Sequence, residues 1–136
     1  MKIHTIDGRD YRLPNALNAF QQELYVHLID WKWQHVTREP GLECGVPYDA
    51  ILPDSCAGQY PMLYPAVRDA LEQHRQVYPF RMHKFFNHMA SSQAANTNLF
   101  LPILQHPAAN AILGRLKGDF ARLATEHLDN GYRVEF

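Results

Sequence analysis

Cysteine is scarce in this chain, which contains only Cys44 and Cys56 among its 136 residues. Two cysteines cannot build the disulfide framework of a small secreted fold, and the first residues lack the apolar core of a signal peptide. No run approaches the roughly 18 to 20 consecutive apolar residues that a membrane-spanning helix needs. We therefore expect a soluble, cytoplasmic protein that does not associate with a membrane.

Excess positive charge is also lacking. Thirteen Lys and Arg residues stand against fourteen Asp and Glu residues, for a formal net charge of −1. This balance excludes the broad cationic field of a non-specific nucleic-acid binder, so any DNA contact must come from a local patch. With 46% hydrophobic and 20% charged residues, the chain is expected to form one globular domain over residues 1–136.

The first third of the chain has the clearest local signals. Asp7-Gly8 can adopt the positive backbone angles of a tight turn, which predicts a β-hairpin of residues 2–6 and 9–13. A long helix is then predicted from Asn15, as its N-cap, to about His35. Its apolar residues recur every three or four positions and should form the packing face: Leu17, Phe20, Leu24, Leu28 and Trp31.

Residues 39–65 contain too many prolines and glycines for a long regular element, but their tyrosines and aliphatic residues predict an ordered loop. A helix is predicted from Pro65 to about Gln76, with Val67 and Leu71 facing inward. The segment 83–89 is predicted to be a short helix.

The last third should be helical as well. Ser91 or Ser92 caps a predicted helix over residues 93–101, which Pro102 should interrupt. Pro107 starts another helix, up to Lys117, whose inner face comprises Ile112, Leu113 and Leu116. Asp119 should cap a final helix that ends at Asn130-Gly131, and residues 132–136 alternate like a half-buried strand. The fold class is therefore α+β, predominantly helical, with five or six helices, an N-terminal β-hairpin and a C-terminal β-strand.

No complete catalytic or metal site is apparent. The phosphate-binding loop, the nucleophile elbow and the His-Glu-x-x-His motif are all absent. Cys44, Cys56, His83 and His88 are possible zinc ligands, but the cysteines lack close pairing, and burial as small hydrophobic residues is favoured. Cys56 with a histidine is the remaining nucleophile pair, and nothing in the sequence orients it.

Two runs imitate parts of a Mg²⁺-dependent nuclease site. Pro53-Asp54 resembles its first acid, and Asp30-Trp31-Lys32 resembles its acid-x-Lys. They occur in the wrong order, and the acid-x-Lys falls within the strongest predicted helix. We therefore interpret Asp30 and Lys32 as its solvated face.

One local concentration of basic residues is interleaved with aromatic residues. It comprises Arg75, Arg81, Lys84, His74, His83 and His88, with Tyr78, Phe80, Phe85 and Phe86. Such a run can contact phosphates, although charged residues around buried aromatics often form an ordinary surface. Gln93 and Asn96, one helical turn apart, can read base edges or satisfy buried backbone groups.

Four runs carry a resemblance that spans most of the chain: QYPMLYP (59–65), FNHMASSQAA (86–95), NLFLP (98–102) and LDNGYRVEF (128–136). They resemble the amino-terminal region of restriction-endonuclease-like proteins of the PD-(D/E)XK nuclease superfamily. In that family a helical region precedes the nuclease core, which holds Mg²⁺ through an Asp-containing segment and a Glu-x-Lys.

This resemblance implies nuclease ancestry for a chain without the catalytic residues. Glu135 is the candidate for a first acid of a missing core, but one carboxylate cannot assemble the metal site, so no cofactor is expected in this chain. Either the chain is a truncated part of a longer nuclease, which the terminal strand favours, or it is a stand-alone protein in which that strand pairs with the hairpin.

The sequence thus predicts an accessory or DNA-positioning domain that is not catalytic by itself. Its candidate nucleic-acid-binding residues are Arg75, Arg81, Lys84, His88, Gln93 and Asn96. The alternative is a small protein-binding module or inhibitor that acts through the aromatic loop of residues 48–64.

Overall fold

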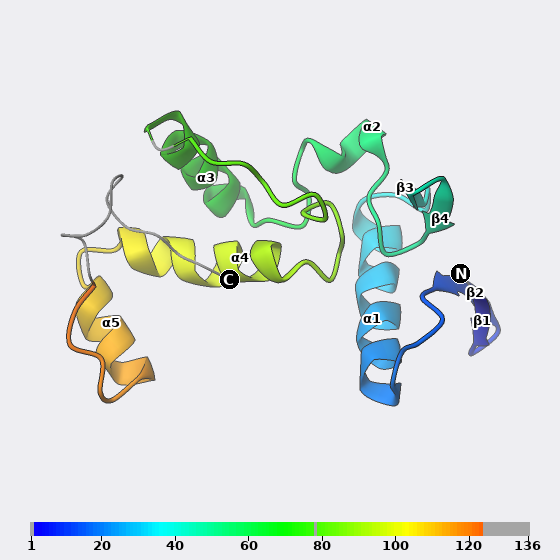
Figure 1. Cartoon of the computed structure of the whole chain (residues 1–136), viewed down its shortest axis with the longest axis horizontal. Coiled ribbons are helices and arrows are strands. Elements are labelled where there is room, and N and C mark those ends of the chain that lie inside the picture. Colours follow the sequence, from blue (N-terminus) through cyan, green and yellow to red (C-terminus); the bar gives the residue numbers. More distant parts are fainter. Residues whose placement is uncertain (1, 78, 124–136) are drawn as a thin grey trace. The chain divides into compact units, whose positions relative to one another are not determined.

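A computed structural model describes residues 2–77 and 79–123, which form an α+β fold dominated by helix (Figure 1). The elements are β1 (Lys2–Ile6), β2 (Arg9–Leu13), α1 (Ala19–His35), β3 (Gly41–Glu43), β4 (Val46–Tyr48), α2 (Asp54–Ala57), α3 (Pro65–Val77), α4 (Ser92–Gln105) and α5 (Ala109–Leu116). The predicted fold class and the N-terminal hairpin are confirmed. Residues 119–123 are not helical, and the rest of the predicted final helix, with the strand 132–136, lies outside the described residues.

The described chain divides into two compact units. The hairpin unit contains residues 2–62 and 83–91, and the helical unit contains residues 63–77, 79–82 and 92–123.

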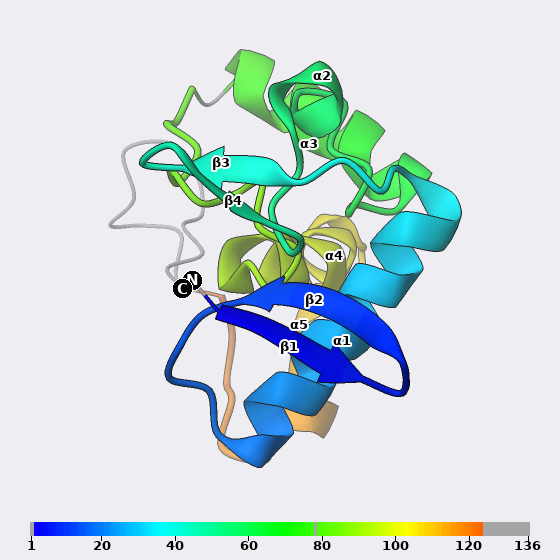
Figure 2. The ribbon, with the colours of Figure 1, turned by 90° about the vertical axis from the view of Figure 1, so that its right-hand side faces the viewer.

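The predicted β1–β2 turn is present. Asp7 and Gly8 have φ angles of 49° and 74°, and the antiparallel register pairs Ile6 with Arg9. Tyr11 and Leu13, two residues apart on β2, point to the same face and are both buried. That face of the hairpin packs beside α1 (Figure 2).

Helix α1 begins later than the sequence indicates. Its N-cap is Asn18, not Asn15: the Asn18 side chain accepts a hydrogen bond from the Gln21 backbone N–H, and the Gln21 side chain accepts one from the Asn18 backbone N–H. This reciprocal capping box satisfies two backbone donors that the first turn leaves open. A helix starting just after Asn15 would lack it.

The packing face predicted for the first long helix is wrong for three of its five residues, although Leu17 does pack against the core. Phe20, Leu24 and Trp31 are 71%, 38% and 37% exposed. The helix instead buries Ile29, and its partly buried Tyr25 joins the core with Tyr11, Leu13 and Ala50. Because α1 carries apolar residues on both sides, its periodicity alone could not select the buried one.

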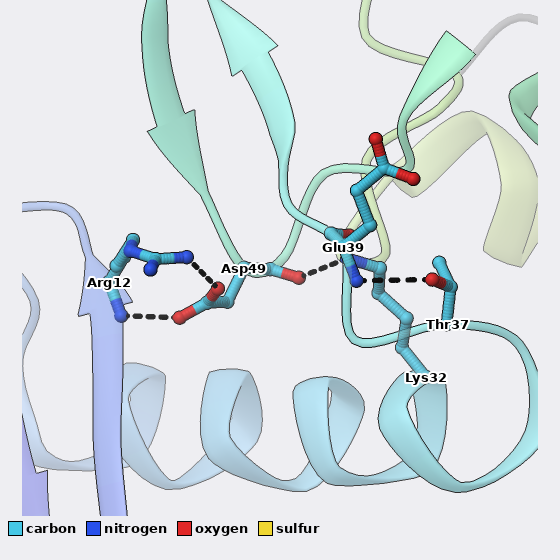
Figure 3. Close-up of polar contacts among 5 residues, drawn as sticks. All are labelled: Arg12, Lys32, Thr37, Glu39 and Asp49. Atoms are coloured by element: carbon cyan, nitrogen blue, oxygen red, sulfur yellow. Dashed lines mark hydrogen bonds and ion pairs between the residues drawn. The ribbon is translucent and has the colours of Figure 1, made fainter. Parts of the chain in front are cut away.

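Lys32 is also not on a solvated face, because it is fully buried. Its ammonium donates hydrogen bonds to the backbone carbonyls of Glu39, at 2.6 Å, and Asp49, at 2.9 Å (Figure 3). The Asp49 carboxylate accepts bonds from the Arg12 backbone N–H, at 2.6 Å, and from the Arg12 guanidinium, at 3.2 Å. Burial lowers the pKa of Lys32, and the negative charge of Asp49 opposes that shift. These contacts connect α1, β2 and the ends of the β3–β4 hairpin.

Residues 39–65 contain no long regular element, as predicted. They form the short β3–β4 hairpin, turned at Cys44 and Gly45 with φ angles of 50° and 78°, and the single-turn helix α2. Their aliphatic residues Ile51, Leu52 and Leu63 are buried, so the segment is ordered.

Segment 83–91 is a series of turns rather than the predicted helix. Besides hydrogen bonds within its own turns, its backbone makes two with residues 50–52: the Met89 N–H donates to the Ala50 carbonyl at 2.7 Å, and the Leu52 N–H donates to the Asn87 carbonyl at 3.0 Å. Phe86 and Met89 are buried. This segment therefore gains more from pairing with the distant chain than from a single helical turn.

In the helical unit, α3 packs against α4 and α4 against α5 (Figure 1). Val67 and Leu71 of α3 are buried, as predicted. Helix α4 buries Ala94, Thr97 and Leu101, and it continues through Pro102 to Gln105. The predicted interruption at Pro102 is wrong, because the buried face of α4 compensates for the one hydrogen bond that proline removes. On α5 the inner residue is Ala109, while Leu116 is 67% exposed, contrary to its predicted inward position.

None of the helices in the described ranges combines the length and apolarity needed to cross a membrane.

Gly41 approaches the backbone of Leu52 so closely that a Cβ atom there would lie 2.5 Å from its carbonyl oxygen and 2.4 Å from a methyl carbon of Ile51. Gly41→Ala should therefore lower the free energy of unfolding by about 1 to 3 kcal/mol. Gly58→Ala is the matched control, since a Cβ there meets nothing within 4 Å. Urea unfolding followed by Trp31 and Trp33 fluorescence measures both, and equal stability of the two variants would contradict this packing.

Lys32→Met keeps the side-chain length but removes the ammonium. Because the backbone carbonyls of Glu39 and Asp49 then lose their donor and the Asp49 carboxylate loses its nearby cation, we expect a loss of about 3 to 5 kcal/mol in the free energy of unfolding. Lys2→Met, at an exposed strand position, is the control. The same urea titration measures both variants. If Lys32→Met lost no more stability than Lys2→Met, the buried hydrogen-bond network would be refuted.

Candidate nucleic-acid interface

The charges of the chain are segregated along its sequence. Residues 73–118 contain none of the fourteen Asp and Glu residues but five of the thirteen Lys and Arg residues: Arg75, Arg81, Lys84, Arg115 and Lys117. The near-zero net charge of the whole chain hides this acid-free stretch. A stretch with basic but no acidic residues favours a local positive potential, which attracts phosphate, although Arg75 and Lys117 form ion pairs with Glu72 and Asp119 at its two ends.

Arg81 and Lys84 are the exposed cations in the irregular segment between α3 and α4. The Lys84 ammonium lies 4.3 Å from the centre of the Phe85 ring. Neither cation forms an ion pair with any residue that the structure describes. Both charges therefore remain available to an anionic partner.

The predicted nucleic-acid-binding residues belong to both units. Arg75 and Arg81 belong to the helical unit, whereas Lys84 and His88 belong to the hairpin unit. Arg75 forms a 3.6 Å ion pair with Glu72, and its guanidinium lies 5.8 Å from the centre of the Phe80 ring. Its charge is therefore already partly balanced.

His88 has a structural position in the hairpin unit. Its Nδ1 accepts a hydrogen bond from the Ala90 backbone N–H at 3.1 Å, and its ring meets Tyr25 edge-on with centroids 5.5 Å apart. Burial lowers the pKa of His88, and the charge of Glu43 opposes the shift. A neutral imidazole that holds a turn is a poor phosphate ligand, and its assignment to nucleic acid stays a prediction.

Gln93 and Asn96 are both half-buried on α4. The Gln93 backbone carbonyl accepts a hydrogen bond from the Thr97 hydroxyl at 2.7 Å. The amide that fixes the start of α3 is a different one, Asn98, whose Oδ1 accepts from the Tyr64 backbone N–H at 3.0 Å. Sequence reasoning missed Asn98, because its partner lies 34 positions away.

The two cysteines lie in different elements of the hairpin unit. Cys44 is exposed in the β3–β4 turn, and the Cys56 thiol of α2 donates to the carbonyl of Pro53, the N-cap of that helix. Within the described ranges, no three His, Cys, Asp or Glu side chains gather where they could hold a metal ion. The described residues therefore do not fit the Mg²⁺ site that the nuclease resemblance implies. Glu135, the candidate first acid, lies outside the described residues.

The alternative prediction assigns protein binding to the aromatic loop of residues 48–64. Several apolar side chains of this loop are buried. Ile51 and Leu52 are buried, and Tyr60 meets Phe86 edge-on with ring centroids 5.3 Å apart. Tyr64 is 69% exposed. A protein-binding role for this loop stays a prediction.

Comparison with known families gives a match over residues 27–134 to the family described as Restriction Endonuclease associating with ARP. The chain belongs to this family. The REase-ARP match covers most of the chain and confirms the predicted relation to restriction endonucleases; membership of the PD-(D/E)XK superfamily stays a prediction. No curated protein and no solved structure matches the chain.

The shifted pKa of His88 gives the hairpin unit a pH dependence. With a folded pKa below the usual 6.5, the folded state binds fewer protons than the unfolded state just below pH 6.5. Stability is therefore complete above pH 6.5 and falls as the pH drops through the folded pKa. His88→Asn, which can still accept the Ala90 N–H, should lose less stability than the unmodified chain between pH 7.5 and 5.5.

Urea unfolding followed by tryptophan fluorescence tests this, because both tryptophans lie on α1 of the hairpin unit. His27→Asn, at an exposed α1 position, is the control and should keep the pH dependence of the unmodified chain. If His88→Asn kept the same dependence, burial of a neutral His88 would be refuted.

Proposed function

We propose that this REase-ARP family member is a non-catalytic accessory domain that positions DNA for a restriction endonuclease, with Arg81 and Lys84 contacting phosphates. The observation that carries the proposal is the acid-free stretch of residues 73–118, in which both cations are exposed. Arg75 and Lys117 of this stretch are paired with Glu72 and Asp119 just outside it, whereas Arg81 and Lys84 form no ion pair with a described residue. Phosphate contacts of this kind hold a protein on DNA without reading its sequence.

Two further points belong to the same proposal. The family description names an association with ARP, so a protein partner is expected in addition to DNA. Two thiols that form no disulfide fit a reducing, cytoplasmic location. Any Mg²⁺-dependent cleavage would then be performed by a nuclease core other than the described residues.

Binding to a labelled duplex, measured by fluorescence anisotropy over a range of salt concentrations, tests the phosphate contacts. Each phosphate neutralised contributes about 0.9 to the slope of log affinity against log salt. If Arg81 and Lys84 each contact one phosphate, the double variant Arg81→Ala/Lys84→Ala should lower that slope by about 1.8 and weaken binding most at low salt.

The control is Lys2→Ala/Arg38→Ala, which removes the same charge from exposed positions outside the acid-free stretch. It should leave the slope close to that of the unmodified chain. If both double variants lowered the salt slope and the affinity equally, the effect would come from net charge alone, and the proposal would be contradicted. Binding of neither duplex nor single-stranded DNA at any salt concentration would contradict it outright.

A further inference from the structure

A hollow of about 240 Å³ lies at the C-terminal end of α3, within the helical unit. It is lined by Glu72, Arg75, Gln76, Pro79 and Phe80. Pockets for drug-sized ligands usually measure roughly 300 to 1,000 Å³, so this hollow suits a single ring system.

Phe80 provides an aromatic surface in this hollow. It is 39% exposed, and its ring contacts two neighbours: the Arg75 guanidinium lies 5.8 Å from its centre, and the His74 ring lies 6.3 Å away, centre to centre. A partly exposed ring that is already held in place loses little conformational entropy when a second ring stacks on it.

The polar groups around the ring match the edges of a nucleobase. Gln76 offers both a donor and an acceptor in its amide, and Glu72 offers an acceptor. Because the Glu72 carboxylate lies 3.6 Å from the Arg75 guanidinium, Arg75 is held beside Phe80 instead of extending to a phosphate. Arg81, exposed and next to Phe80 in the chain, is free of such an ion pair within the described residues and can supply the phosphate contact.

We propose that this hollow binds an unpaired nucleobase of a DNA strand, stacked on Phe80 with its phosphate beside Arg81. In a duplex both faces of each base are covered by its neighbours, so a ring in a hollow can reach only a base that is unstacked or single-stranded. Stacking on an aromatic ring tolerates any base, which fits a domain that positions DNA without reading it. The inference rests on the proposed DNA-binding function and specifies the form of DNA.

The test compares three probes by fluorescence anisotropy or competition: labelled oligo(dT), a duplex of the same length, and free dTMP. We expect the full chain to bind the strand more tightly than the duplex and to bind dTMP far more weakly than either. Phe80→Leu should lower affinity for the strand about tenfold while leaving the duplex affinity unchanged. Phe80→Tyr, which keeps a stacking ring, should restore strand binding, and Phe20→Leu, at another exposed phenylalanine, should have no effect.

The outcomes separate this inference from the function on which it rests. If strand and duplex bind with the expected salt dependence but Phe80→Leu changes neither, the hollow holds no base and the DNA-binding proposal stands. If dTMP binds as tightly as the strand, the hollow is a site for a free nucleotide and the inference is overturned. If neither strand nor duplex binds, both proposals fail.

Discussion

The buried Lys32 ammonium is the contact on which the hairpin unit depends. It hydrogen-bonds to the backbone carbonyls of Glu39 and Asp49, on either side of the β3–β4 hairpin, and so joins them to the last turn of α1. Asp49 then links that point to β2 through Arg12. Removing a charged ammonium from water costs free energy. It is tolerated only where the ammonium donates hydrogen bonds and an opposite charge lies near it. The Lys32 and Asp49 side chains together therefore connect α1, β2 and the two ends of the β3–β4 hairpin.

The same arrangement positions the candidate interface. Gly41 donates to the Ile51 carbonyl, and residues 50–52 in turn pair with the turns of residues 83–91. Lys84 and Phe85 thus project from a segment whose backbone is bonded to the hairpin unit, and not from a mobile linker. Accessory side chains that contact phosphate act best from such a supported backbone, because little order must be gained on binding.

The sequence correctly predicted those features that depend on residues close together in the chain. The Asp7-Gly8 turn, the inward faces of α3 and the broken character of residues 39–65 all follow from residue types over a few positions. The buried Lys32 and the pairing of residues 83–91 with 50–52 depend on partners far along the chain, so local patterns indicated a solvated lysine and a short helix instead. For the site, Arg81 and Lys84 were predictable as exposed cations, whereas Asn98, and the hollow beside Phe80, required the fold.

The most direct test of the account is ultraviolet crosslinking of the full chain to DNA that carries 5-bromodeoxyuridine, with the modified peptides identified by mass spectrometry. The account predicts adducts within residues 79–85, around Phe80, Arg81 and Lys84. Adducts confined to residues 48–64, or spread over acid-containing segments such as the β1–β2 hairpin, would contradict it and would remove the acid-free stretch as the site of DNA contact.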